Sequence, residues 1–286
     1  MTFLTTRIRN ITIGQPFAIG QRADILLGDL DDELGNSVKV AVKVLRAVPY
    51  DDKAARQELR QNLETHLVTW CALKHPNITN FLGLSYDVPF PAAIVLPYYS
   101  KGNSLEFVKR EKNADVLKLI QGAARGLKYL HEQSPPIIHA DIRACNVLVD
   151  DEENARLVDF ALVPVLSTTT FTTTNVVGPA RWQAPEVFLT EEEDRLPFTL
   201  KTDVFSFSMF SVELLTRDRP FKERKIDTVV IVDITKNLRP RKPAGSTLAD
   251  ALWPILQQCW AQAPGDRPTM SAVCEGLESI KSHPSA

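Results

Sequence analysis

The hydrophobic pattern of this 286-residue chain changes once, near residue 97, and this change restricts the folds that the chain can adopt. Before it, apolar stretches typical of strands cover 17–30, 39–45, 79–86 and 92–97, and one helical pattern interrupts them over 51–73. After it, helical spacing dominates over 114–131, 201–215, 248–261 and 269–281. Strands followed by helices predict an α+β chain with two lobes, joined near 97–102.

The predicted helices differ in how much of their surface is apolar. The apolar face of 51–73 comprises Leu59, Leu63, Leu67 and Trp70. The apolar face of 114–131 comprises Leu117, Ile120, Ala124, Leu127 and Leu130. The segment 201–215 is apolar almost all round, so we expect it to form a buried helix. The last two helices each begin near a Ser, Thr or Asp that can cap them.

Composition excludes several classes of protein. Lysine and arginine number 33 against 35 aspartates and glutamates, so the net charge of −2 provides no basic field for nucleic acid. No apolar run is long enough to span a membrane, and the first residues lack the apolar core of a signal peptide. Four scattered cysteines suit a reducing compartment. We therefore expect a cytoplasmic protein, with the nucleus as an open alternative.

Polar side chains lie beside short apolar strands at three places. Lys43 ends the apolar run 40–42. Asp141 and Asn146 lie five residues apart, just before the apolar run 147–149. Asp159 comes 13 residues after Asn146, at the end of another short strand. Each has an ordinary alternative, because a lysine can be an edge charge and Asp and Asn are common turn formers.

Three further motifs complete an ordered set, namely Ala184-Pro185-Glu186, Asp203 in the predicted buried helix, and Arg267-Pro268. In this order and spacing the set resembles the eukaryotic protein kinase catalytic domain, over roughly 13–281. The runs 126–131 and 259–269 are similar to the tyrosine-kinase and tyrosine-kinase-like branch. The resemblance implies a single kinase domain over 1–286. Its small antiparallel β lobe, with one helix, would cover 13–97, and its larger, mainly α-helical lobe 98–281.

The resemblance implies ATP-dependent transfer of a phosphoryl group to a protein hydroxyl, a reaction that needs positioning and charge neutralisation. It places Lys43 on the nucleotide phosphates, and Asp141 where it receives or orients the proton of the substrate hydroxyl. Arg143 is the third residue matched to the catalytic set. Asn146 and Asp159 match the oxygen ligands of Mg²⁺, which is a hard cation.

An adenine site follows from the same resemblance. Leu96 matches the gatekeeper, and the Pro97 carbonyl and the Tyr99 backbone match the groups that face the adenine edge. The remaining matches are the phosphate-loop residue Gly20 and the four ring-sandwiching residues Phe17, Ile25, Ala41 and Leu148. These four apolar residues would equally suit an ordinary core.

Two pairs of residues match supporting roles. Glu186 and Arg267 match a buried ion pair that fixes the larger lobe, and removing one partner of such a pair leaves an uncompensated charge. His139 and Phe160 match packing residues that align the catalytic loop with the metal-binding aspartate.

The phosphate-binding loop departs from the kinase pattern of three glycines. The corresponding positions hold Ala18, Gly20 and Ala23, while Arg22 replaces the usual aromatic tip. Because glycine lets backbone N–H groups approach phosphate closely, we expect a weaker grip, partly offset by the charge of Arg22.

The helix after Lys43 also departs from the pattern. The position of its glutamate, nine residues before His75, holds His66. Glu64 lies about 200° away around the helix and Glu58 a little over two turns away. Lys43 therefore loses its usual partner, and Asp159 is left as an alternative one.

Further departures lie in the second lobe. Ala161 and Ser208 replace glycines, and Ala161 restricts the hinge after Asp159. Ala140 replaces the arginine that binds activation-loop phosphate in the family, so we expect no dependence on such phosphorylation. We expect the threonines at 168–170 and 172–174 to form a polar loop rather than sites of modification.

Whether the acceptor hydroxyl belongs to Ser/Thr or to Tyr stays open. Arg143-Ala144 and the run 179–182, including Pro179, are similar to tyrosine kinases, but both matches are short. We expect a protein kinase of reduced activity, acting with ATP and Mg²⁺ on a protein substrate or signalling partner. The alternative is a pseudokinase that acts as a nucleotide-binding or protein-interaction scaffold. A non-kinase binding domain would leave the ordered motifs unexplained.

Overall fold

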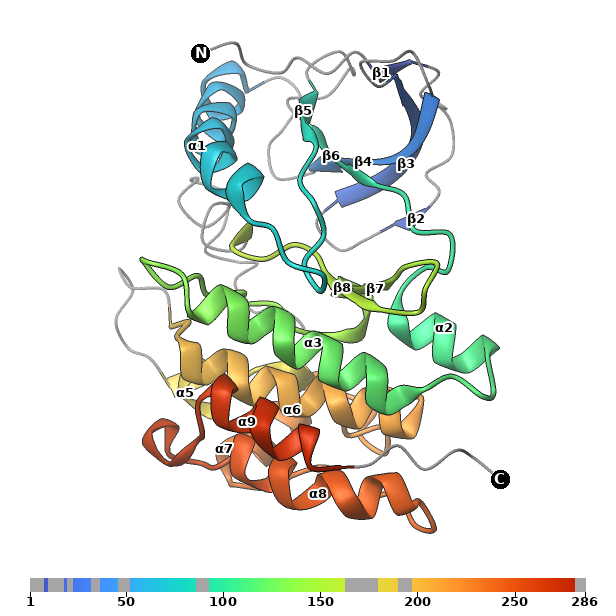
Figure 1. Cartoon of the computed structure of the whole chain (residues 1–286). Coiled ribbons are helices and arrows are strands. Elements are labelled where there is room, and N and C mark those ends of the chain that lie inside the picture. The colour runs from blue at the N-terminus through green and yellow to red at the C-terminus, as the bar shows by residue number, and fades with distance from the viewer. Residues whose placement is uncertain are drawn as a thin grey trace. The chain divides into compact units, whose positions relative to one another are not determined.

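The computed structural model describes residues 8–9, 18–19, 23–31, 37–45, 52–85, 93–162, 180–189 and 197–280. They fall into two compact units, the first ending at Tyr98 and the second beginning at Tyr99. Figure 1 shows an antiparallel sheet with one helix in the first unit and mainly helices in the second. This confirms the predicted α+β class and the protein kinase fold.

The first unit is built on one antiparallel sheet. Its strands are β1 (Ile8–Arg9), β2 (Ala18–Ile19), β3 (Ala23–Asp31), β4 (Ser37–Leu45), β5 (Gly83–Ser85) and β6 (Ala93–Pro97). They follow the order β1-β3-β4-β6-β5, and β2 pairs with β3. Alternation along β4 buries Val40, Val42 and Val44 in a cluster with Leu26 and Val95. Since successive strand residues face opposite sides, the intervening residues of β4 line the other face of the sheet.

Helix α1 (Lys53–Ala72) is the predicted helix of the first unit. Asp52 caps it by accepting a hydrogen bond from the Ala55 N–H at 2.9 Å. Its buried residues are Ala55, Leu59, Leu63 and Trp70, whereas the expected core residue Leu67 is only half-buried.

The strand predicted over 79–86 is shorter than expected, because β5 covers only Gly83–Ser85. Ile78 and Phe81 are both buried, three residues apart. Two residues three apart cannot share one face of a strand, where side chains alternate with a period of two. Residues 79–82 therefore lie outside the described strands, although Thr79 and Phe81 are buried.

The second unit is mainly helical. Its helices are α2 (Ser104–Arg110), α3 (Val116–His131), α5 (Pro185–Leu189), α6 (Leu200–Thr216), α7 (Asp227–Thr235), α8 (Thr247–Cys259) and α9 (Met270–Glu278). A small hairpin joins β7 (Val147–Val149) to β8 (Ala155–Leu157). Helix α3 contacts α6 and α9, and all five apolar residues predicted for its inner face are buried.

Helix α6 forms the centre of the second unit, as its apolar sequence predicted. Every residue from Thr202 to Leu214 is buried. Ser246 and Thr269 cap α8 and α9, which confirms the predicted caps. Helices α2, α5 and α7 had no clear helical signal, because α2 and α5 are short and α7 is rich in β-branched residues that favour strands.

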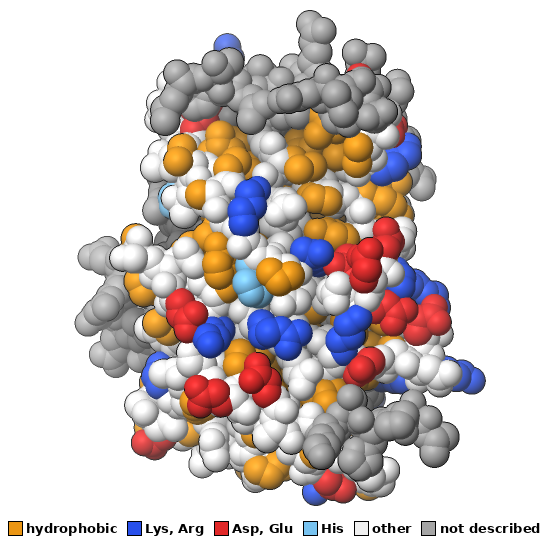
Figure 2. All heavy atoms as spheres, in the orientation of Figure 1, with side chains coloured by type: hydrophobic (Ala, Val, Ile, Leu, Met, Phe, Trp, Pro, Cys, Tyr) orange, Lys and Arg blue, Asp and Glu red, His pale blue; other side chains and the backbone are white. Residues whose placement is uncertain are grey.

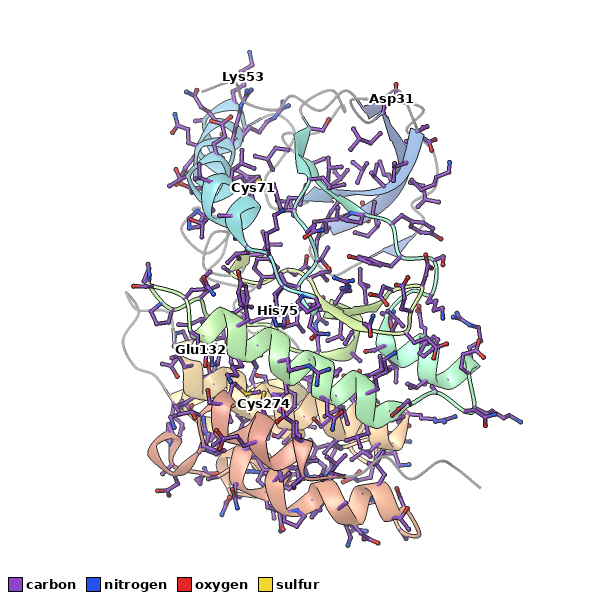
Figure 3. All side chains as sticks on the ribbon, in the orientation of Figure 1. Asp31, Lys53, Cys71, His75, Glu132 and Cys274 are labelled. Atoms are coloured by element: carbon purple, nitrogen blue, oxygen red, sulfur yellow. The ribbon has the colours of Figure 1, made fainter. Side chains whose placement is uncertain are left out.

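The surface and the cysteines agree with a protein of near-neutral charge and free thiols. Basic and acidic side chains are interspersed over the visible face of the second unit (Figure 2). All four cysteines are free, among them Cys71 on α1 and Cys274 on α9 (Figure 3). Within the described residues, no helix combines the length and apolar character that crossing a bilayer requires.

Candidate active site

The loop over 139–146, called the catalytic loop below, is attached to α6 by a buried carboxylate. Asp203 accepts hydrogen bonds from the backbone N–H groups of His139, at 2.7 Å, and Ala140, at 2.8 Å. The His131 ring nitrogen Nε2 lies 3.0 Å from the same carboxylate. Ala140 adopts a left-handed conformation with φ of 67°. Because buried acceptors require donors, these bonds fix the direction in which the chain enters the loop.

Asp141 is 9% exposed and is oriented by two neighbours in the loop. Arg143 Nη2 donates to Oδ2 at 3.2 Å, and its Nε lies 3.0 Å from Oδ1. Asn146 Nδ2 donates to the Asp141 carbonyl at 2.8 Å and to Oδ2 at 2.9 Å. Burial alone would lower the pKa of Arg143, but Asp141 and other anionic neighbours raise it above the usual value. The carboxylate is thus held as an acceptor by charge-assisted hydrogen bonds.

Asn146 and Asp159 supply oxygen donors from the same part of the second unit. The Val158 N–H donates to the Asn146 carbonyl at 3.0 Å, which fixes the chain just before Asp159. Asp159 lies two residues beyond β8, with φ of 63°. Asn146 Nδ2 is used by Asp141, while its Oδ1, which accepts the Cys145 Sγ–H at 3.5 Å, has a second lone pair to face a cation.

The donor chemistry fits Mg²⁺, which prefers carboxylate and amide oxygens and keeps several waters. In the part of the chain that the structure describes, no cluster of three or more His, Cys, Asp or Glu side chains could hold a metal ion alone. Asn146 and Asp159 would therefore hold the ion together with substrate phosphates rather than in a cage of protein ligands.

His139 and Phe160 pack edge to face, with ring centroids 6.5 Å apart. Burial lowers the pKa of His139, against the effect of Asp203 and two other aspartates. The Asp141 N–H also points at His139 Nδ1, at 3.3 Å. His139 is thus a neutral packing residue, as expected.

The residues matched to the nucleotide in the first unit share one face of the sheet. Lys43 on β4 lies opposite Ile25 on β3 and Ile94 on β6. Ala41, two residues earlier, lies opposite Leu96. This face is the reverse of the one that carries the valine core. Lys43 is 9% exposed, while Ile25, Ala41 and Leu96 are half-buried.

The other residues that the resemblance matches to the nucleotide do not lie on this face. Pro97 ends β6 opposite Val40. Tyr99 is the first residue of the second unit, where Leu148 on β7 lies opposite Arg156. Ala18 on β2 pairs with Ile25, and Ala23 is buried at the start of β3. Outside the described residues are Phe17, Gly20, Arg22, Pro179 and the threonines at 168–170 and 172–174.

His66 lies on the core-facing side of α1. At 3.6 residues per turn, its position coincides with the stripe of Leu59, Leu63 and Trp70. Its Nδ1 lies 2.9 Å from the Asn62 carbonyl, and its ring centroid lies 5.8 Å from that of Trp70. The position that the family gives to a glutamate is therefore occupied by a ring that packs against its own helix.

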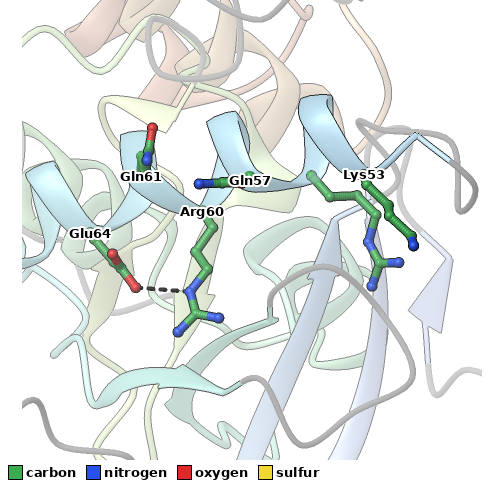
Figure 4. A pocket seen from close by; sticks show the side chains of 6 residues that line it. Lys53, Gln57, Arg60, Gln61 and Glu64 are labelled. Carbon is green, nitrogen blue, oxygen red and sulfur yellow. Dashed lines mark hydrogen bonds and ion pairs between the residues drawn. The ribbon is translucent and has the colours of Figure 1, made fainter.

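Glu64 lies on another side of α1, as its spacing from His66 predicted. Its carboxylate forms an ion pair with Arg60 Nε at 3.0 Å (Figure 4). Both side chains line a pocket of about 480 Å³ along the helix, together with Lys53, Arg56, Gln57 and Gln61.

The expected ion pair of Glu186 and Arg267 is present in the second unit. Arg267 Nη1 and Nη2 donate to the two carboxylate oxygens at 2.6 and 2.8 Å. The Arg267 side chain is fully buried, and its guanidinium lies 5.2 Å from the centroid of the Phe205 ring. This pair attaches α5 to the loop before α9.

One buried residue beside the catalytic loop carried no motif in the sequence. Glu213 on α6 is 4% exposed and accepts hydrogen bonds from the Ala144 N–H and the Trp182 indole. The sequence feature that could have identified it is a single carboxylate near the C-terminal end of a mostly apolar helix.

The chain is similar to known proteins over most of its length. A family model described as protein tyrosine and serine/threonine kinase matches residues 11–277. The serine/threonine/tyrosine-protein kinase HT1 of Arabidopsis thaliana is 30% identical over 279 residues, which are 96% of this chain and 67% of HT1. The serine/threonine-protein kinase TNNI3K of Mus musculus is 31% identical over 84% of this chain and 28% of TNNI3K. The chain thus spans about two thirds of the first relative and far less of the second.

Proposed function

The chain belongs to the protein tyrosine and serine/threonine kinase family, and from this premise we propose that it transfers the γ-phosphate of ATP to a hydroxyl of a protein substrate, at a reduced rate. The observation that carries the proposal is the orientation of Asp141 by Arg143 and Asn146. A carboxylate held in this way is a suitable acceptor for a hydroxyl proton. The acceptor residue is Ser, Thr or Tyr.

In the proposed reaction, Asp141 accepts the proton of the attacking hydroxyl while the new O–P bond forms and the bond to the β-phosphate oxygen breaks. Lys43 neutralises charge on the nucleotide phosphates. Asn146 and Asp159 would hold Mg²⁺, which supplies charge neutralisation at the phosphate oxygens when bound. By the resemblance, Phe17, Ile25, Ala41 and Leu148 would sandwich the adenine ring, Leu96 would be the gatekeeper, and the Pro97 carbonyl and Tyr99 backbone would face the adenine edge.

We attribute the reduced rate to changes at the positions that match phosphate binding in the family. His66 offers no carboxylate to Lys43, and Ala18 and Ala23 stand where the family has glycine. The same observations favour a second candidate function, a scaffold that binds nucleotide or protein partners without transferring phosphate. The free thiols and the near-neutral charge support a cytoplasmic or nuclear location and a protein rather than a nucleic-acid partner.

The test combines a thermal shift with Mg²⁺-ATP and transfer of radiolabelled phosphate to a generic protein substrate. We expect transfer by the wild type, and a loss of about 10²-fold or more in Asp141→Asn. Asp151→Asn is the matched control, because Asp151 lies on the nearby β7–β8 turn and bonds Ser100. Stabilisation by nucleotide without transfer in the wild type would contradict the kinase and support the scaffold. Phosphoamino-acid analysis of the product identifies the acceptor.

A further inference from the structure

The pocket of about 480 Å³ in the first unit lies along one face of helix α1 (Figure 4). At 3.6 residues per turn, Lys53, Arg60 and Glu64 fall within about 40° of one another around the helix axis. Gln57 and Gln61 widen this face, and Lys53 and Arg60 extend from the same side of the helix in Figure 4. The buried residues of α1 are not among those that line the pocket, so this face is not the one that packs into the core.

The pocket has an excess of positive charge. Lys53, Arg56 and Arg60 provide three cations, and Glu64 is the one acid among the described residues that line it. The Glu64 carboxylate is already paired with Arg60 Nε at 3.0 Å. Gln57 and Gln61 add amide N–H donors. Three cations and one anion give this lining a net charge of +2, in a chain whose net charge is −2.

The cations lie toward the end of the helix where positive charge is least favourable. A helix N-terminus carries about +0.5 of an elementary charge and favours acidic side chains in the first turn. The first turn of α1 has no acid, and the helix begins with Lys53. Asp52, the cap residue, already accepts the Ala55 N–H. A bound anion would offset this repulsion, and a local preference that is violated in this way is common at functional sites.

The size and the lining of the pocket define a class of ligand. All six described residues that line it are polar or charged, so an apolar ligand would leave their polar groups without partners. The volume of about 480 Å³ suits a small molecule. Lys53 and Arg60 are separated by about 10 Å along the helix axis, which is more than one phosphate group spans. A ligand that satisfies both cations therefore carries more than one anionic group.

We propose that this face of α1 binds a small polyanion that carries several phosphoryl groups, of the kind found in inositol polyphosphates. Lys53 and Arg56 would bind one phosphoryl group, Arg60 would bind another, and the two glutamines would donate to the remaining oxygens. The proposal goes beyond the proposed kinase function, because none of these residues is matched to ATP or to the acceptor, and binding requires no phosphate transfer.

The test is isothermal titration calorimetry of the full chain with inositol hexakisphosphate. We expect saturable binding at one site, and a lower affinity at higher salt. The triple variant Lys53→Gln/Arg56→Gln/Arg60→Gln should weaken binding at least about 10²-fold, because hydrogen bonds to charged groups contribute about tenfold or more each.

The matched control removes the same charge from another place. Lys222→Gln/Lys225→Gln/Lys236→Gln replaces three exposed lysines near or on α7 and should change the affinity by less than about 2-fold. Equal losses of affinity in the two triple variants would overturn the proposal, since binding would then depend on net charge alone. Absence of saturable binding to the wild type would overturn it as well.

A variant with tighter binding separates the site from a loss of folding. Glu64→Gln removes the one acid of the described lining and releases Arg60 from its ion pair. We expect its affinity for inositol hexakisphosphate to rise by up to about 5-fold, the scale of an exposed ion pair. A loss of affinity in Glu64→Gln would contradict the proposed position of the ligand.

Free polyphosphates and phosphoinositide headgroups share this chemistry, and vesicles distinguish the two sources. The chain is sedimented with phosphatidylcholine vesicles that contain phosphatidylinositol bisphosphate, and with phosphatidylserine vesicles of equal surface charge. Binding to the phosphoinositide vesicles alone, lost in the triple variant of α1, would support the site with a lipid headgroup as its ligand. Binding of free inositol hexakisphosphate without binding to either vesicle would support the site with a soluble ligand. Binding of both probes that the triple variant of α1 retains would overturn the site.

Discussion

The catalytic loop of the second unit and helix α1 of the first unit keep the kinase pattern to different degrees. In the loop, Asp141 and Asn146 match the family and are joined by hydrogen bonds of 2.8 and 2.9 Å. In α1, the position of the family glutamate holds His66. The residues matched to the acceptor hydroxyl and to the metal ion are thus retained, while the residue matched to the partner of Lys43 has changed.

Burial and bonding explain this difference. The loop backbone donates to two buried acids of α6, Asp203 and Glu213, so a change of either acid would leave buried N–H groups without acceptors. His66 is half-buried and is bonded within its own helix. A substitution there removes few partners, so the helix can change at this position without loss of the fold.

The largest expected effect tests the framework of the second unit. Arg267→Met should lower the free energy of unfolding by about 3–5 kcal/mol, because it removes a fully buried guanidinium that bonds both carboxylate oxygens of Glu186. Chemical denaturation measures the change. The contrasting variant is Lys242→Met, whose pair with Asp250 is 44% and 60% exposed. That variant should cost under about 1 kcal/mol. Equal losses would show that the buried pair does not support the unit.

The second prediction tests α1. His66→Glu restores a carboxylate on the core-facing side of the helix, and we expect kcat to rise by about 10²-fold, the scale of one preorganised electrostatic contact. Initial rates at saturating ATP measure it. Thr65→Glu adds the same charge at an exposed position of α1 and should leave kcat unchanged. No gain in His66→Glu would mean that His66 does not occupy the position of the Lys43 partner.

The third prediction concerns the hairpin that follows the catalytic loop. Asp150 accepts from the Asn154 N–H at 2.7 Å and from Arg156 Nε at 2.8 Å. Burial tends to raise the pKa of Asp150, but these donors lower it below the usual value. A lowered pKa means that the carboxylate stabilises the fold above the pKa of the unfolded chain, and that this contribution is lost as the pH falls through the folded value.

Asp150→Asn should therefore cost about 1–2 kcal/mol at neutral pH. The difference between variant and wild type should shrink as the pH falls below about 4. Urea unfolding at a series of pH values measures it. A constant difference across the acid range would show that the charge of Asp150 contributes nothing.

The prediction with the smallest expected effect concerns a departure from the kinase pattern within the second unit. Ala161 stands where the family has glycine and adopts φ of 56°. Ala161→Gly relieves about 1–2 kcal/mol of strain from the left-handed backbone conformation. Glycine also raises the conformational entropy of the unfolded chain, which offsets about 0.4–1 kcal/mol of this gain. We expect a net gain of about 0.5–1 kcal/mol in the free energy of unfolding. Ala251→Gly, in the exposed part of α8, should instead lose up to about 1 kcal/mol. A loss in both variants would show that Ala161 is not strained.

Motif order and helical periodicity predicted most of the second unit. The inner face of α3 and the burial of α6 depend on spacing, which is a local property of the sequence, whereas the Glu186–Arg267 pair was predicted from the resemblance. The match of His66 to the family glutamate came from the resemblance, by counting back nine residues from His75, and its place on the core-facing side of α1 is a finding of the structure. The roles of Lys43, Asp141, Asn146 and Asp159 stay predictions from the resemblance.

Tertiary packing decided what the sequence did not show. Helix α7 is rich in valine and isoleucine, and packing overrides their preference for strands. The strand predicted over 79–86 is limited to Gly83–Ser85, the three residues that pair with β6. Glu213 had no local signal of its role, because its partners lie 31 and 69 residues away in the sequence.

The bonds between the catalytic loop and α6 also have a consequence for synthesis on the ribosome. Ala140 is held by a residue 63 positions later, and Ala144 by one 69 positions later. At about 5–20 residues per second, roughly 3 to 14 s separate the appearance of the loop from that of its acceptors. During this interval the nascent loop has neither anchor, so the reactive geometry is acquired only when the growing chain has passed Glu213.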